Sequence, residues 1–179
     1  MVVLVGAELE AVEAAVAEAR AQADEVWVAN VNAPGQVVVS GEISAVERLA
    51  KAAPAIGGKV IRVPVGGAFH TPLMAPAEAE LGQALMLSRF AQRHRPVVAN
   101  VDAKPYVYGH VWPALALRQL TSPVRWSESV SVMAQSLGCT TLLELGPGRS
   151  LVGMARRIAP AIPAASVNHP DALADMVDR

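Results

Sequence analysis

The order of strand-like and helix-like runs in residues 1–65 constrains the fold more than any other feature of this sequence. Short valine-rich runs alternate with two segments whose apolar residues recur at helical spacing, as Leu9, Val12 and Val16 do. The predicted elements in chain order are a strand at Val2–Val5, a helix at Glu8–Ala23, strands at Val26–Val31 and Gln36–Ser40, a helix at Ser44–Ala53 and a strand at Lys59–Val65.

A tight turn joins the two middle strands. The segment Asn32-Ala33-Pro34-Gly35 contains the residue types that favour a hairpin connection. A strand-helix-strand unit on each side of this hairpin predicts the split βαβ, or ferredoxin-like, βαββαβ arrangement for residues 1–65. We therefore expect an α+β subdomain in this part of an α/β chain.

The sequence pattern of residues 66–179 predicts a second region, in which strands and helices alternate as in a parallel α/β sheet. Helices are expected at Pro72–Arg89, Trp112–Leu120, Trp126–Leu137, Ser150–Ile158 and Asp171–Val177, strands at Pro96–Val101, Thr141–Leu145 and Ala164–Val167, and an irregular loop at Tyr106–Gly109. So few strands cannot form a parallel sheet with both faces covered. The mean hydropathy of +0.33 fits apolar surface whose covering elements lie outside this sequence.

The composition limits the partners and the compartment. A formal net charge of −1 offers no attraction for nucleic acid or for an anionic membrane surface. Cys139 is the single cysteine, which excludes an internal disulfide and favours a reducing cytoplasm. We expect Cys139 to be a small buried apolar side chain. The sequence has no group of His, Cys and carboxylate residues at metal-ligand spacing, so no metal is expected.

His70 is the strongest candidate for a catalytic residue. It follows the apolar run that ends at Val65 and precedes Pro72, which is placed to begin a helix. A histidine at such a corner is placed like a general base. The sequence contains no Gly-x-Ser-x-Gly turn, so it predicts a base without its nucleophile. The other histidines, His94, His110 and His169, are expected in surface or loop positions.

Five segments together carry a resemblance to a known family. They are Val31–Gly41, Gly67–Met74, Asn100–Ala103, Arg118–Leu120 with Pro123–Trp126, and Glu144–Gly148. In the same order, they resemble blocks of the malonyl-CoA:acyl-carrier-protein transacylases. The first is similar to the family's Asn-x-Pro-Gly-Gln hairpin and the second to its catalytic-histidine segment. The resemblance spans nearly the whole chain.

The resemblance implies which part of that fold this chain represents. The family has an α/β-hydrolase-like large subdomain, into which a ferredoxin-like small subdomain is inserted. Residues 1–65 resemble the small subdomain, and residues 66–179 resemble the C-terminal part of the large acyltransferase subdomain. The family's N-terminal part, with its Gly-His-Ser-x-Gly nucleophile turn, has no counterpart here. We therefore expect this chain alone to be inactive, whether it comes from a truncated gene, an internal start or a split enzyme whose separate N-terminal half supplies the serine.

The resemblance also implies roles for four residues. His70 would be the general base, and the backbone carbonyl of Gln119 would hold the other ring nitrogen. Phe69 would favour malonyl over methylmalonyl substrates by occupying the space of the extra methyl group. Asn32, and more weakly Asn30, would face the acyl pocket. Core packing for Phe69, an exposed helix end for Gln119 and turn chemistry for Asn32 remain open alternatives.

The implied function is transfer of a malonyl group from CoA to the phosphopantetheine thiol of acyl carrier protein in fatty-acid synthesis. The resemblance implies no cofactor, because the CoA thioester is a substrate and phosphopantetheine is carried by the partner protein. Two alternatives stay open. One is the same portion of a polyketide-synthase acyltransferase, and the other is a non-catalytic module that binds acyl carrier protein.

Overall fold

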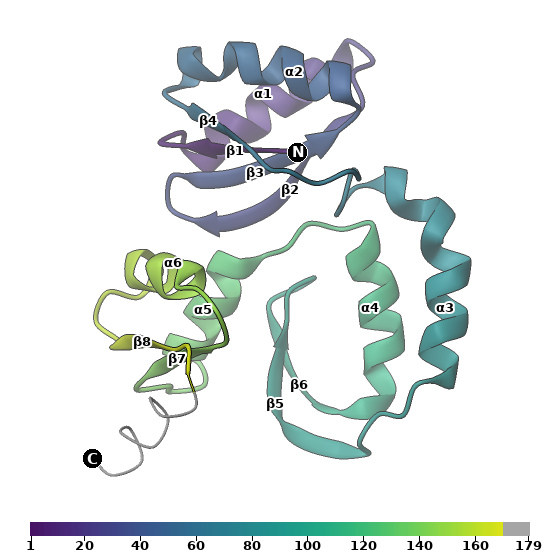
Figure 1. Ribbon diagram of the computed structural model, residues 1–179, viewed down its shortest axis with the longest axis vertical. Coiled ribbons are helices and arrows are strands. Elements are labelled where there is room, and N and C mark those ends of the chain that lie inside the picture. The colour runs from purple at the N-terminus through teal and green to yellow at the C-terminus, as the bar shows by residue number, and fades with distance from the viewer. Residues whose placement is uncertain (170–179) are drawn as a thin grey trace. The chain divides into compact units, whose positions relative to one another are not determined.

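A computed structural model describes residues 1–169 of the chain (Figure 1). The chain divides into two compact units, Met1–Ser129 and a second that begins at Val130. The helix predicted at Asp171–Val177 lies outside the described residues.

The first part of unit one contains every strand and helix predicted for residues 1–65. The elements are β1 (Val2–Val5), α1 (Leu9–Ala21), β2 (Val26–Ala33), β3 (Gln36–Gly41), α2 (Ile43–Ala52), the 3-10 turn η1 (Ala53–Ile56) and β4 (Lys59–Arg62). The boundary that differs most from the prediction is the end of β4, which lies at Arg62 and not at Val65. Pro64 lacks the N–H that would continue the ladder, and Val63 donates its N–H to the Met1 carbonyl.

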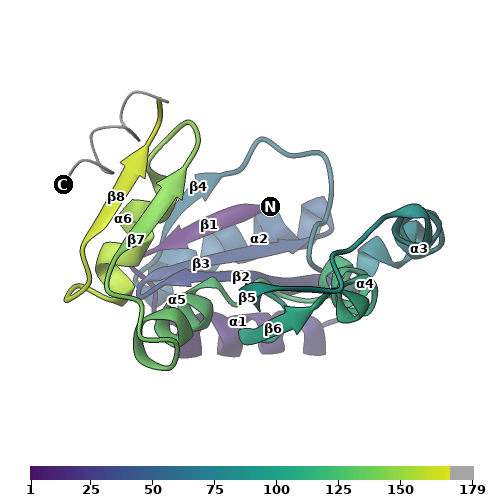
Figure 2. The same ribbon diagram turned by 90° about the horizontal axis from the view of Figure 1, so that it is seen from below.

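These four strands form one antiparallel sheet in the order β2-β3-β1-β4 (Figure 2). Val2 on β1 pairs with Val39 on β3 and with Arg62 on β4. Helices α1 and α2 both lie on one face of the sheet (Figure 1). Between the helices and that face lies the main core of the unit. Its largest fully buried side chains are Val2, Leu4, Val12, Val26, Val37 and Val39.

The rest of unit one is a helical pair with a two-stranded ribbon. Its elements are η2 (Pro72–Ala77), α3 (Glu78–Leu87), β5 (Arg93–Ala99), β6 (Lys104–Tyr108), η3 (Gly109–Val111) and α4 (Trp112–Leu120), and α5 (Trp126–Gln135) begins here. Helix α3 packs beside α4 (Figure 1). A small core of Ala99, Val101 and Leu115 lies between the ribbon and α4. The single helix predicted from Pro72 is thus a 3-10 segment followed by an α-helix.

The loop predicted at Tyr106–Gly109 is wrong, because most of it belongs to strand β6. Strand β6 pairs antiparallel with β5, so the expected parallel arrangement is wrong for this pair. The turn between them places Ala103 at φ 55° and bonds its N–H to the Ala99 carbonyl at 2.8 Å. Pro105 weakens the sequence pattern of a strand, yet proline is compatible with the edge strand of such a ribbon.

Unit two contains the parallel pairing that the alternation predicted. Strand β7 (Leu142–Leu145) pairs in parallel with β8 (Ala164–Val167), and α6 (Ser150–Ile158) connects them and packs on both. Cys139 precedes β7 and is half-buried, so it is less buried than predicted. Among the residues that the structure describes, no helix is long and apolar enough to cross a membrane.

Candidate functional site

His70 lies in the turn between β4 and η2, in an unusual backbone conformation. Its φ of 61° is in the left-handed region, which costs a residue with a side chain of the order of 1–3 kcal/mol. Such a conformation persists only where the surroundings determine it. The side chain of His70 is half-buried.

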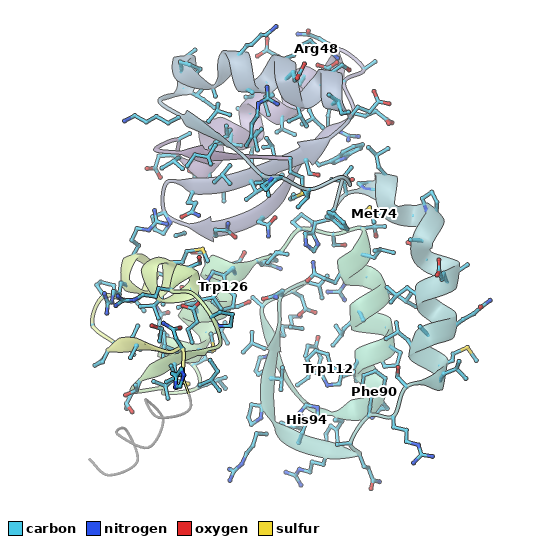
Figure 3. All side chains as sticks on the ribbon, viewed as in Figure 1. Arg48, Met74, Phe90, His94, Trp112 and Trp126 are labelled. Carbon is cyan, nitrogen blue, oxygen red and sulfur yellow. The ribbon has the colours of Figure 1, made fainter. Side chains whose placement is uncertain are left out.

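Thr71 fixes the backbone on both sides of His70. Its hydroxyl donates to the Ala68 carbonyl at 2.7 Å and accepts from the Leu73 N–H at 3.3 Å. The Thr71 side chain is fully buried and is the N-cap of η2, which contains Met74 (Figure 3). This pair of hydrogen bonds spans the histidine and holds the turn in place.

The ring of His70 meets the C-terminal end of α4. Its Nδ1 atom lies 3.2 Å from the backbone carbonyl oxygen of Gln119. The side-chain Nε2 of Gln119 donates to the carbonyls of Ser122 at 2.8 Å and Pro123 at 3.3 Å, and it also lies 3.5 Å from His70 Nδ1. The structure thus brings together two of the residues singled out from the sequence.

The segment after Pro123 ties this site to the first sheet. Val124 donates its N–H to the Ala29 carbonyl at 2.8 Å and accepts from the Val31 N–H at 2.9 Å. Arg125 donates its N–H to the carbonyl of Asn100 at 2.8 Å. Four of the five segments that carry the family resemblance therefore contact one another or adjoin the same turn.

The two asparagines of β2 lie beside this junction. Asn30 and Asn32 are both half-buried, and Asn30 forms an isolated parallel bridge with Val124. Asn32 belongs to β2 itself, because the strand continues to Ala33 and the turn is shorter than predicted. Its role toward an acyl group stays a prediction.

Phe69 is more exposed than a core residue. Phe69 is 41% exposed in this chain. A Cβ atom on Gly67 would lie 3.0 Å from the Phe69 ring, so the glycine provides the space in which the ring sits. The Phe69 ring is therefore accessible beside His70 in the chain, and its effect on substrate choice stays a prediction.

Asp102 was not singled out from the sequence, yet it organises the side of α4 next to the site. Its Oδ2 accepts from Arg118 at 2.8 Å and from the Tyr106 hydroxyl at 2.9 Å, and its Oδ1 accepts from the Lys104 N–H at 3.3 Å. Burial alone would raise the pKa of Asp102, but these donors outweigh it, so the pKa lies below its usual value. The only signal in the sequence was the Asn100–Ala103 segment.

His94 is not the surface residue that the sequence predicted. It is half-buried on β5, and its Nε2 accepts from the Trp112 indole N–H at 2.7 Å (Figure 3). The two rings lie 5.8 Å apart between centroids. His110 and His169 are exposed, as predicted. Among the described residues, no group of three or more His, Cys, Asp or Glu side chains could hold a metal ion.

Comparisons with known proteins point to one kind of enzyme. No family model matches the chain. The malonyl CoA-acyl carrier protein transacylase of Escherichia coli (strain K12) is 38% identical over 175 residues, which are 97% of this chain and 56% of that protein. The polyketide biosynthesis malonyl CoA-acyl carrier protein transacylase of Bacillus subtilis (strain 168) is 36% identical over 136 residues, covering 75% of this chain and 46% of that protein.

Solved structures agree with the sequence comparisons. A malonyl-transacylase in complex with a type II polyketide synthase acyl-carrier protein matches 99% of this chain with a TM-score of 0.91 and 38% identity. An acyl carrier protein S-malonyltransferase from Vibrio cholerae matches 98% with a TM-score of 0.90 and 36% identity. This chain covers 57% of each. The mixed α/β fold thus matches the C-terminal part of these transacylases, and the chain spans about half the length of the relatives it matches.

Proposed function

We propose that this chain is the C-terminal portion of an acyltransferase that moves a malonyl group from CoA to the phosphopantetheine thiol of acyl carrier protein. The observation that carries the proposal is the contact between His70 Nδ1 and the Gln119 carbonyl at 3.2 Å. A carbonyl can only accept, so a hydrogen bond across this contact requires a proton on Nδ1. Nε2 then keeps a lone pair in the neutral ring.

The proposed reaction needs a nucleophilic serine, and this sequence contains no Gly-x-Ser-x-Gly turn that would carry it. A serine hydroxyl attacks the malonyl thioester carbonyl while His70 Nε2 takes its proton. The thioester C–S bond breaks, the malonyl group becomes a serine ester, and the proton passes from His70 to the departing CoA sulfur. The phosphopantetheine thiol then gives its proton to His70 and attacks the ester. His70 finally returns the proton to the serine oxygen.

The finer parts of the proposal concern fold, partners and compartment. The sheet order β2-β3-β1-β4 supports a ferredoxin-like small subdomain in residues 1–65, with residues 66–179 as the C-terminal part of the large acyltransferase subdomain. The partners would be malonyl-CoA, acyl carrier protein and an N-terminal half that carries the serine. The reaction needs no cofactor beyond these substrates. The lone Cys139 supports a cytoplasmic location.

Two observations favour a second candidate in polyketide synthesis. The relative from Bacillus subtilis is named for polyketide biosynthesis, and one matching structure contains a type II polyketide synthase carrier protein. The chemistry would be the same, and only the carrier protein would differ. A non-catalytic module that binds carrier protein is the third candidate.

Complementation tests the proposal directly. The 179-residue chain incubated with labelled malonyl-CoA should carry no covalent label, because it lacks the serine turn. Adding a separately produced N-terminal half of a malonyl transacylase that bears the turn should restore transfer to acyl carrier protein. His70→Ala should then reduce turnover by roughly 10²- to 10⁴-fold.

His110→Ala is the matched control, because His110 is an exposed histidine of the same unit. Its reconstituted turnover should equal that of the unmodified chain. An assembled complex with full activity in His70→Ala would remove His70 from the mechanism. An assembled complex that binds carrier protein but never transfers malonyl would favour the non-catalytic module.

A further inference from the structure

The backbone carbonyl of Gln119 lacks its usual helical hydrogen-bond donor, because the residue four positions later is a proline. In a continuing α-helix this carbonyl would accept from the N–H of residue 123. That residue is Pro123, which has no N–H. The N–H of Ser122 reaches the same oxygen only at 3.4 Å. The end of α4 therefore presents a carbonyl that can accept a hydrogen bond from His70.

The side-chain amide of Gln119 is fully occupied elsewhere. Its Nε2 has two hydrogens, and two carbonyl oxygens lie within reach, at 2.8 Å from Ser122 and 3.3 Å from Pro123. Carbonyls only accept, so the end of the amide that faces them is the NH₂ group. Nε2 also lies 3.5 Å from His70 Nδ1, but it has no third hydrogen to donate.

We propose that the side chain of Gln119 is a positioning residue that sets the tautomer of His70. By bonding to Ser122 and Pro123 it closes the turn after α4 and holds its own carbonyl against Nδ1. Because the same bonds use both amide hydrogens, no donor competes for Nδ1. The proton stays on Nδ1, and Nε2 keeps its lone pair. An amide released from the turn could instead donate to Nδ1, which would move the ring proton to Nε2.

The alternative is that the backbone carbonyl acts alone and the side chain only covers the helix end. Gln119→Met separates the two, because methionine keeps the carbonyl and the approximate side-chain length but has no N–H donor. Both residues are good helix formers, so the change leaves the propensity of α4 nearly unchanged. Gln83→Met, at an exposed position of α3, is the matched control.

The ring tautomer can be read from the ¹⁵N shifts of His70 in histidine-labelled chain at about pH 8, where an ordinary imidazole is neutral. The signals of His70 are those that disappear in His70→Asn. The unmodified chain and Gln83→Met should show one dominant Nδ1–H tautomer. Gln119→Met should show a mixture with the Nε2–H form. A Gln119→Met chain that is folded and keeps the Nδ1–H tautomer overturns the proposal.

A second variant guards against loss of the fold. Gln119→Leu also removes the donor and should give the same mixture of tautomers. If both variants unfold, the Gln119 side chain maintains the fold and does not set the tautomer of the His70 ring, and the proposal is equally overturned. The melting temperature of each variant decides which case applies.

This inference rests on the proposed function only in one respect, namely that the lone pair on His70 Nε2 acts as the general base. In the reconstituted enzyme, Gln119→Met should lower kcat by roughly 10- to 100-fold with little change in KM, because the base is misplaced while the substrate contacts remain. A tautomer change without any transacylase activity in the unmodified complex would refute the proposed function alone. An active complex whose kcat is unaffected by Gln119→Met would refute the positioning role alone.

Discussion

Residues 1–62 and residues 63–129 belong to one compact unit but are held together by different interactions. The first region has an apolar core in which Leu4, Val12 and Val26 are 0% exposed. In the second region, α3 has no buried residue, and its Met86 and Leu87 are 86% and 87% exposed. The second region has only the small apolar core of Ala99, Val101 and Leu115, and polar contacts made by Thr71, Asp102 and Gln119 add to its order.

The difference separates the source of stability from the place of the chemistry. Burial of apolar side chains is the dominant favourable term in folding, so the first region should contribute most of the unfolding free energy. His70 and the residues that orient it all lie in the second region. The second region should open more easily than the first, because few of its apolar side chains are buried.

The largest expected effect is the difference in stability loss between a buried leucine of the first region and an exposed leucine of the second. Leu4→Ala should lower the free energy of unfolding by about 2–5 kcal/mol, because it opens a cavity in a fully buried site. Leu87→Ala removes the same atoms from an exposed site and should change the free energy of unfolding by less than about 0.5 kcal/mol. Urea denaturation of both variants measures the two changes in the free energy of unfolding. Equal losses would falsify the contrast between the regions.

Phe69→Ser tests whether the exposed ring of the second region serves substrate choice. In the reconstituted enzyme the preference for malonyl-CoA over methylmalonyl-CoA should narrow by roughly 10- to 200-fold, the value of one methyl clash. The melting temperature should change little, because the side chain is 41% exposed. Competition between the two thioesters measures the preference. Unchanged selectivity together with a large fall in melting temperature would assign Phe69 to packing.

Thr71→Val asks whether polar contacts stabilise the turn around His70. Valine has nearly the same shape but neither donates to Ala68 nor accepts from Leu73, and loss of an N-cap costs about 0.5–2 kcal/mol. Thr71→Ser keeps the hydroxyl and is the control. The free energy of unfolding measures the cost. If serine and valine destabilise the chain equally, the hydroxyl contributes nothing and packing explains the burial of Thr71.

The smallest expected effect is on the pH dependence of stability. The pKa of Asp102 is lowered in the fold, so its contribution is present above the unfolded value of about 3.9 and is lost as the pH falls through the folded value. Because Arg118 is 53% exposed, solvent screening limits this contribution to about 1 kcal/mol or less. Asp102→Asn should therefore flatten the acid limb of a stability–pH curve measured by urea unfolding. Parallel acid limbs in the two proteins would contradict the role of this carboxylate.

The same contrast explains which elements could be predicted from the sequence. In residues 1–62 the strands and helices have strong apolar periodicity, so the patterns predicted all of them, and turn chemistry located the hairpin. Strand β6 was missed because it contains Pro105 and pairs with only one neighbour. The half-buried position of His94 was missed because its partner Trp112 lies on another element, and no local pattern carries that contact.

The candidate site was predictable only in part, for a similar reason. His70 and Gln119 could be found from the segments around them. The left-handed conformation of His70, the hydroxyl of Thr71 and the carboxylate of Asp102 depend on atoms that the fold brings together. Asp102 in particular collects donors from β6 and α4, and a single sequence does not record which of its polar residues converge.

The backbone of His70 has a consequence for how this chain responds to selection. At φ 61° glycine is the residue with the least conformational cost, so His70→Gly should relieve strain in the turn while removing the imidazole. A screen that rewards thermal tolerance alone would therefore favour glycine at the very position on which the proposed chemistry depends. Backbone strain and the proposed chemistry therefore make opposite demands on this one residue.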